Sequence, residues 1–168
     1  MSRIFISMHY MELGGAERAL LGLLETLSET EHQVDLFIYS HQGELMTYIP
    51  EGINLLPEIS AYAALEKPMK KILLQGHWEM VLARLWAKLT NWRHNRHLSG
   101  EVSSIFDEVG RATSRILPSL HHLGKYDLAI SFLTPHFIVR DKVRAKRKIA
   151  WIHTDYSTIV VNASRELP

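Results

Sequence analysis

The sequence predicts an α/β fold in which a parallel β-sheet is flanked by helices. Short apolar runs with strand character alternate along the chain with longer segments of helical character, which favours parallel strands joined by right-handed crossovers. The first of these runs also leads through a glycine pair, Gly14-Gly15, straight into an amphipathic segment. The 168 residues are enough for one domain with a hydrophobic core.

In the first half of the chain, the mostly apolar residues Arg3–Met8 form the first predicted strand. A helix follows from about Ala16 to Leu27, because its apolar residues recur at helical spacing. A second strand is predicted over Gln33–Tyr39 and is followed by a loop over residues 40–43. A shorter third strand spans Ile53–Leu56, before a proline.

In the second half, residues 65–97 have a helical composition, and two further strands are predicted over Tyr126–Ser131 and Lys148–Ile152. Ligands of such sheets bind outside the carboxyl ends of the strands. We therefore expect three loops to share one rim of the sheet. These are residues 9–15, the residues after Ser131, and residues 153–156.

The glycine pair indicates a sharp turn that leaves room beside the backbone. The free amides at the start of the next helix would favour an anion such as a phosphate there. A plain structural turn explains the same two glycines. Glu17, in the first helical turn, suits the positive end of the helix dipole, and Arg18 could reach a phosphate. His9 lies in the same loop and would face the ligand cleft.

Three stretches resemble family 4 glycosyltransferases. The run Gly-Gly-Ala-Glu-Arg at residues 14–18 is similar to the motif that follows the first strand of that family. Residues 148–156, Lys-Ile-Ala-Trp-Ile-His-Thr-Asp-Tyr, resemble a later strand that ends in a histidine at the cleft, and residues 126–131 resemble the strand before it. The stretches occur in the family's order, whereas residues 58–118 match none of its motifs.

The resemblance implies a GT-B fold, in which two Rossmann-like domains face each other across a cleft. Residues 1–168 would then be a truncated N-terminal, acceptor-side domain, without the C-terminal domain that binds the donor. The full enzyme would transfer a sugar from a nucleotide-sugar to an acceptor hydroxyl, with retention of configuration and without a metal or another cofactor. The glycine loop would approach the donor diphosphate, and Arg18 belongs to the family motif. We expect no turnover by this half alone.

His153 and Asp155 are the candidate catalytic residues. His153 directly follows an apolar strand at the expected rim, where an imidazole can donate a hydrogen bond to a sugar hydroxyl or change its charge near neutral pH. The resemblance implies contact with the donor sugar, whereas capping of a neighbouring helix is the structural alternative. Asp155 could orient His153 or deprotonate an acceptor hydroxyl, or it could be a helix N-cap.

Composition excludes several other classes. A net charge of +1 is too balanced for a nucleic-acid-binding protein, and a chain without cysteine has no disulfide and no thiolate zinc site. No acid completes a metal site with the histidine pairs at 94 and 97 or 121 and 122. The N-terminal residues do not read as a signal peptide, and no apolar run approaches the roughly 20 residues of a membrane span. We expect a cytoplasmic protein, with peripheral contact to the inner face of the membrane left open.

Residues 68–97 combine an apolar helical face with many basic residues. The face consists of Trp78, Leu82, Leu85, Leu89 and Trp92, with Trp86 beside it. Packing into a core, the usual role of such a face, and lying in a membrane interface both explain this pattern, and the lipid-linked acceptors of many family members bring the second level with the first. The basic run at 142–148 is expected to be a solvated face.

Two other functional classes are compatible with a Rossmann-like sequence. A Rossmann-like domain can bind a nucleotide or a protein partner without catalysis, because fold alone does not determine function. A dinucleotide-dependent oxidoreductase is disfavoured, since the Gly-x-Gly-x-x-Gly fingerprint is absent and Asp35 is only a loose match for a ribose-binding acid.

Overall fold

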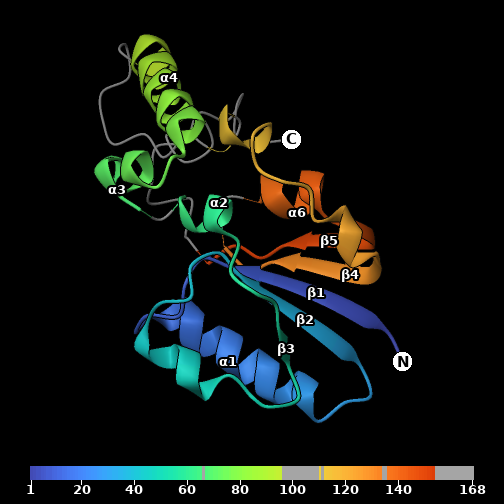
Figure 1. The fold of residues 1–168 in the computed structure, drawn as a ribbon. Helices are drawn as coiled ribbons and strands as arrows, with labels where there is room; N and C mark the ends of the chain where they lie inside the picture. The colour runs from blue at the N-terminus through green and yellow to red at the C-terminus, as the bar shows by residue number, and fades with distance from the viewer. Residues whose placement is uncertain (66, 96–109, 111, 134–135, 154–168) are drawn as a thin grey trace. The chain divides into compact units, whose positions relative to one another are not determined.

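A computed structural model describes residues 1–65, 67–95, 110, 112–133 and 136–153 (Figure 1). The chain divides into two compact units. One, the sheet unit, comprises residues 1–67 and 118–152, and the other, the helical unit, comprises residues 68–117 and 153–168. The sheet unit confirms the predicted α/β class, because it contains five parallel strands flanked by helices.

The strands lie side by side in the order β3-β2-β1-β4-β5, so the first strand of the chain is central. Their bounds are Arg3–Met8 (β1), Gln33–Ile38 (β2), Asn54–Leu55 (β3), Lys125–Ser131 (β4) and Arg144–Ala150 (β5). All pairings are parallel, and Ile4 of β1 lies between Val34 of β2 and Leu128 of β4. The strand order reverses between β1 and β4, which is where ligands bind in doubly wound sheets.

Helices and short helical turns connect the strands. In the sheet unit they are α1 (Gly15–Ser28), the 3₁₀ turn η1 (Glu44–Tyr48), α2 (Ser60–Ala63), the 3₁₀ turn η2 (His121–Leu123) and α6 (Phe137–Lys142). In the helical unit they are α3 (Met69–Leu74) and α4 (Trp78–Asn95). The predicted helical region is therefore broken in two, at Gly76, whose φ of +80° suits only glycine well.

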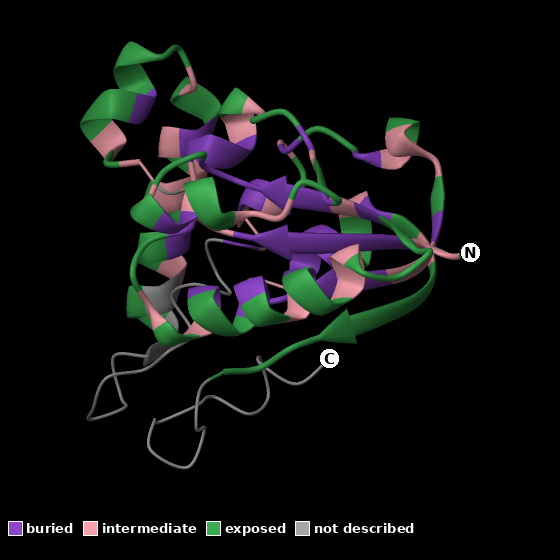
Figure 2. Ribbon diagram, turned by 90° about the horizontal axis from the view of Figure 1, so that it is seen from below, coloured by how far each residue is buried: buried purple, intermediate pink, exposed green. Residues whose placement is uncertain are grey.

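The fifth strand begins four residues earlier than predicted. Residues 144–150 form β5, so most of the basic run is the strand itself rather than a segment before it. All residues of β5 except Ala145 are exposed (Figure 2), which agrees with the expected solvated face. Lysine and arginine are common on such edge strands because they discourage pairing with another sheet.

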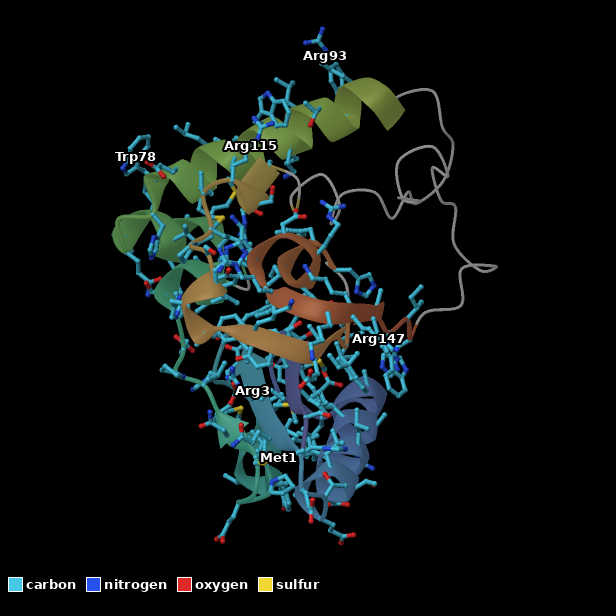
Figure 3. The ribbon with its side chains drawn as sticks, turned by 90° about the vertical axis from the view of Figure 1, so that its right-hand side faces the viewer. Met1, Arg3, Trp78, Arg93, Arg115 and Arg147 are labelled. Carbon is cyan, nitrogen blue, oxygen red and sulfur yellow. The ribbon has the colours of Figure 1, made fainter. Side chains whose placement is uncertain are left out.

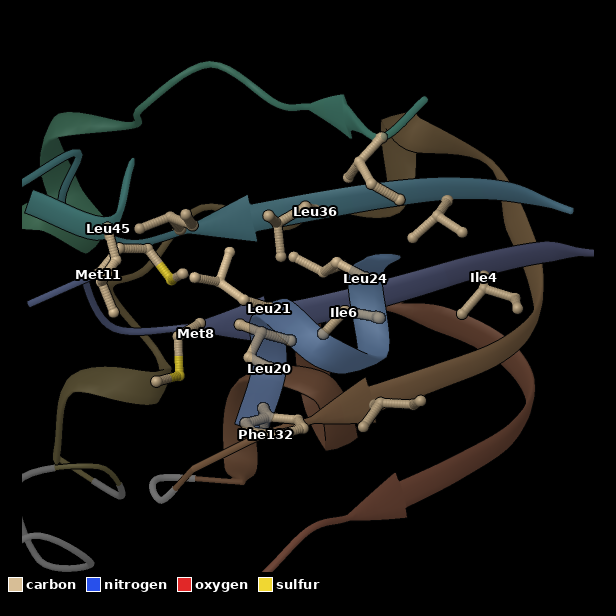
Figure 4. Packing of buried hydrophobic residues seen from close by; sticks show 14 residues of the cluster. Ile4, Ile6, Met8, Met11, Leu20, Leu21, Leu24, Leu36, Leu45 and Phe132 are labelled. Atoms are coloured by element: carbon tan, nitrogen blue, oxygen red, sulfur yellow. The ribbon is translucent and has the colours of Figure 1, made fainter. Parts of the chain in front are cut away.

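One face of the sheet packs against α1 through aliphatic side chains (Figure 4). Leu20, Leu21 and Leu24 are buried on one side of α1. They cluster with alternate residues of the two central strands, among them Ile4, Ile6, Met8, Val34, Leu36 and Ile38. Alternation along each strand sends the residues between them to the other face.

The other face carries an aromatic cluster. The ring centroids of Phe5 and Phe37 are 6.1 Å apart, and Tyr62 of α2 meets Phe37 edge-on at 5.0 Å. Burial raises the pKa of Tyr62, and its hydroxyl donates to the Pro118 carbonyl over 2.6 Å. This bond ties α2 to the segment that leads into β4.

At the amino end of the sheet, Asp35 is the centre of a polar network. Its carboxylate accepts hydrogen bonds from the Tyr126 hydroxyl (2.6 Å), the Asn54 amide (2.6 Å) and the Arg3 guanidinium (3.1 Å). Arg3 also lies over the Tyr126 ring, 4.6 Å from its centroid. Asp35 therefore ties its own strand, β2, to β1, β3 and β4 toward the end of the sheet opposite the ligand rim, which removes it as a ribose-binding acid.

Candidate functional site

The carboxyl ends of β1 and β4 bring two buried serines together. Ser7 and Ser131 are paired in the register of the two strands, and each is about 1% exposed. Both lie on the face opposite α1, where the Tyr39 hydroxyl donates to Ser7 Oγ over 3.3 Å. This is the point at which the strand order reverses, so the topology favours a ligand here.

His136 stands over this position, at the start of α6. Its Nδ1 lies 2.9 Å from Ser131 Oγ, and the same hydroxyl donates to the Leu133 carbonyl over 3.0 Å. A serine hydroxyl has one proton to donate. Both contacts are satisfied when that proton goes to Leu133 and Nδ1 of His136 is the donor to Ser131, and we assign this tautomer. In the neutral ring, Nε2 then carries a lone pair and acts as an acceptor.

Nε2 of His136 is buried and has no hydrogen-bond partner among the described residues. Burial, and secondarily the neighbouring His9, lowers the pKa of His136, so the ring is neutral at physiological pH. Buried polar atoms in native proteins nearly always have a partner, which is often a water or a ligand. An O–H or N–H group of a ligand would complete this site.

His9 borders the same site, as the sequence predicted for the loop after β1. Its ring is half-buried and tilted against the Tyr39 ring, with 5.1 Å between the centroids. It lies close enough to His136 to affect the pKa of that residue. The sequence analysis placed the loop after Ser131 on the rim but missed His136 within it. A histidine five residues beyond a strand end was the signal available.

The glycine pair at the start of α1 has a different structural basis from the one expected. Neither residue has a positive φ, and Gly14, the N-cap, is extended at φ −149°. The bend before α1 therefore needs no backbone conformation reserved for glycine. A Cβ atom at Gly14 would meet the carboxylate end of the Glu17 side chain, which could move to make room for it. At Gly15 a Cβ atom would meet nothing within 4 Å.

Glu17 changes the electrostatics of this helix end. Its side chain is buried and folds back beside Gly14, in the first turn of α1. A carboxylate at a helix N-terminus is stabilised by the positive end of the dipole. A phosphate would meet that negative charge at Gly14, so its open approach is from the side of Gly15, where Arg18 is also exposed.

The loops that follow β1 and β2 are joined by backbone hydrogen bonds. The Met11 amide donates to the Gln42 carbonyl over 2.9 Å, and the Leu45 amide donates to the Met11 carbonyl over 2.9 Å. Gly43 sits between them with φ +106°, and a Cβ atom there would collide with the Met11 backbone. The His9 loop is thereby held in one position relative to β2. A shallow pocket beside it is lined by Glu12, Leu13, Gly43 and Glu44.

The two candidate catalytic residues are not brought into this site by the described structure. His153 is exposed and follows Ile152, the last residue of the sheet unit, but it belongs to the helical unit. Asp155 lies outside the described residues. Within the described ranges, no three histidine or acidic side chains converge to hold a metal ion. None of the described helices has the length and hydrophobicity to cross a bilayer.

Comparison of the chain with models of known protein families, with curated proteins and with solved structures found no match.

Proposed function

We propose that this chain is the acceptor-side domain of a glycosyltransferase and that the carboxyl edge of its sheet binds sugar hydroxyls. The observation that carries the proposal is the buried, unsatisfied Nε2 acceptor of His136 at the strand-order reversal. The resemblance of residues 14–18, 126–131 and 148–156 to family 4 glycosyltransferases supplies the reaction class.

The chemistry of the site suits an alcohol. A hydroxyl that donates its proton to His136 Nε2 keeps its oxygen lone pairs directed away from the ring, so the oxygen can attack an anomeric carbon. Orienting a nucleophile in this way is a major part of catalysis by proximity. The Ser131 bond fixes the imidazole tautomer and its rotation. In this scheme His136 positions the acceptor and His9 shapes the same pocket.

The nucleotide-sugar donor would be shared with a second domain. Gly15 and Arg18 offer an open, cationic approach for its diphosphate on this side. His153 keeps the donor-sugar contact that the resemblance implies, and Asp155 would orient His153 or deprotonate the acceptor hydroxyl. Sugar transfer is proposed for the complete enzyme only. This chain alone is expected to bind nucleotide-sugars weakly and to show no turnover.

Histidine side-chain NMR tests the hydroxyl site directly. Methyl glycosides added to the ¹⁵N-labelled chain should shift the Nε2 resonance of His136, and the His9 resonances by less. His122, which is exposed on η2, is the internal control and should not respond. Unchanged His136 resonances at saturating sugar would refute the site.

Calorimetry then separates sugar from nucleotide binding. Uridine and guanosine diphosphate sugars should bind weakly, and the His136→Phe variant should lose the smaller response of the His9 resonances to methyl glycosides. Tight nucleotide-sugar binding by this chain alone would contradict the assignment of the main donor site to a second domain.

A nucleotide-binding module without catalysis is the second candidate. The open backbone at Gly15 beside the exposed Arg18 favours it. Under this alternative, nucleoside diphosphates without a sugar should bind as well as nucleotide-sugars do. Arg18→Ala should abolish that binding, and methyl glycosides should leave His136 unaffected.

A further inference from the structure

Helix α4 presents its largest apolar side chains to solvent. Six leucines and tryptophans are each between 49% and 63% exposed, namely Trp78, Leu82, Leu85, Trp86, Leu89 and Trp92. Counted at about 100° per residue, they fall within an arc of about 120° on one side of the helix. The stripe is therefore largely exposed in the structure, as an interfacial helix requires.

The opposite side of α4 is the one that packs. Met80 and Ala87 are buried there, and Ala83 and Thr90 are partly buried. Amphipathic helices of globular proteins normally turn their large apolar residues inward. Here the small residues are used for packing and the large ones remain outside, so the exposed stripe is not the by-product of a loosely packed helix.

Helix α3 adds to the same kind of surface within the helical unit. It packs against α4, and its Leu73 and Leu74 are 59% and 87% exposed. Its Lys70 and Lys71 are exposed as well. We call the exposed apolar residues of α3 and α4, together with Lys70, Lys71, Lys88 and Arg93, the α3–α4 patch.

Positive charge is concentrated around the patch. Residues 68–95 contain five basic residues and one acidic residue, Glu79, whereas the rest of the chain contains 14 basic and 17 acidic residues. Counted at about 100° per residue, Lys88 lies just beyond one edge of the apolar arc, and Arg93 lies within the arc near its other edge. Figure 3 shows Trp78 and Arg93 projecting from opposite ends of α4.

We propose that the α3–α4 patch binds the surface of an anionic lipid bilayer, with α4 lying in the plane of the interface. Tryptophan and leucine on one face with flanking lysine and arginine are the composition of interfacial helices, and tryptophan prefers the headgroup level. Protein interfaces are depleted in lysine, which disfavours a protein partner for this surface. The proposal is independent of the sugar site.

Vesicle co-sedimentation of the full chain is the direct test. Vesicles of phosphatidylcholine with phosphatidylserine should bind the chain, and vesicles of phosphatidylcholine alone should bind it at least tenfold more weakly. Raising the salt from about 0.1 M to about 0.5 M should weaken binding to the anionic vesicles, because surface charges are then screened. Three of the four tryptophans lie in α4, so binding should also shift the tryptophan emission to the blue.

Matched variants separate the apolar and the electrostatic contributions. The double variant Trp78→Ala with Trp92→Ala should bind at least tenfold more weakly, and Lys88→Glu with Arg93→Glu should lose the salt-sensitive part. Tyr48→Ala and Lys125→Glu are the controls, since both residues are exposed on the sheet unit. Circular dichroism of each variant establishes that it is folded.

Three results would overturn the proposal. They are no sedimentation at either salt concentration, equal binding to neutral and anionic vesicles, and equal losses in the control and patch variants. Sedimentation velocity tests the other possible binding partner of the patch, a second copy of the chain. If the chain does not bind vesicles but forms a dimer, and Trp86→Glu converts that dimer to monomers, the patch is an interface between two copies of the chain.

Discussion

Asp35, on β2 toward the amino end of the sheet, and His136, at the start of α6 over the carboxyl end, are both polar groups beside the sheet, but their surroundings differ. Asp35 accepts hydrogen bonds from three different strands or strand ends. His136 uses one ring nitrogen for Ser131 and leaves the other buried without a partner among the described residues. A fully paired network stabilises a fold, whereas an unpaired buried acceptor costs stability.

The difference indicates that the amino end of the sheet stabilises the fold, whereas the carboxyl end keeps an acceptor for a ligand. At the amino end, burial and the hydrogen bond to Asp35 raise the pKa of Tyr126, so its hydroxyl stays a donor at any ordinary pH. At the carboxyl end, burial and His9 lower the pKa of His136, so its ring stays an acceptor. Polar groups that a fold leaves unsatisfied concentrate at functional sites.

The largest effect is expected from Gly43→Ala, which would disrupt the loops at the carboxyl end of the sheet. The residue lies at φ +106° and ψ 152°, a region open almost only to glycine, and the new Cβ atom would collide with the Met11 backbone. We expect the free energy of unfolding to fall by about 4 kcal/mol, or the His9 loop to detach. Urea unfolding measures the loss. Gly22→Ala, in open space on α1, should instead stabilise the protein by about 0.5 kcal/mol.

Asp35→Ala tests the amino end and should cost about 3 kcal/mol in the free energy of unfolding. The cost arises because the Tyr126 hydroxyl, the Asn54 amide and the Arg3 guanidinium lose a shared acceptor. The response of His136 to methyl glycosides should be unchanged. Lys146→Ala, which removes an exposed ion pair to Asp127, is the control and should have little effect on stability. Loss of the sugar response in Asp35→Ala would contradict the separation of the two ends.

His136→Leu should stabilise the protein, in contrast to the two preceding substitutions. Leucine removes the unpaired Nε2 and fills much of the ring's space, while Ser131 keeps its bond to the Leu133 carbonyl. We expect the free energy of unfolding to rise by about 1 kcal/mol and sugar binding to be lost. His122→Leu, at an exposed histidine, should change neither. A loss of stability in His136→Leu would show that the imidazole is a structural group.

The smallest effect concerns pH. The pKa of His136 is lowered below its ordinary value of 6.5 in the folded protein, so the unfolded chain binds a proton there more readily. The free energy of unfolding should therefore be greatest above about pH 6.5 and should fall as the pH drops from that value to the folded pKa. Urea unfolding at a series of pH values should show this fall in the wild type. His136→Leu should reduce it, and an unchanged pH profile would exclude His136 as its source.

Periodicity predicted the central part of the sheet well. β1 has the predicted bounds, and β2 ends one residue earlier than expected. Both strands are apolar and lie in the interior, where the pattern is strongest. β5 was placed too late because its residues 144–148 are mostly charged, as an edge strand allows. α6 is six residues long, too short to show a helical period, and it was not predicted.

Only the part of the candidate site that follows from strand topology could be predicted from the sequence. His9 follows a predicted strand directly, so the carboxyl-edge rule places it on the rim. The role of His136 depends on a bond to Ser131 and on burial of Nε2, and both arise from tertiary packing. For the glycine pair, the sequence suggested conformational freedom, whereas neither glycine has a positive φ and Gly15 has open space beside it.

The central position of β1 has a consequence for how the chain folds during synthesis. One side of β1 can pair with β2 early, but its other side pairs with β4, and Arg3 and Asp127 are 124 residues apart. At a translation rate of about 5–20 residues per second, that side of β1 waits on the order of 10 s for its neighbour. The apolar edge of a half-built sheet is open to wrong pairing during that time. Ribosome-bound nascent chains that end before β4 should therefore be the most aggregation-prone, and those that include it should become protected from proteolysis.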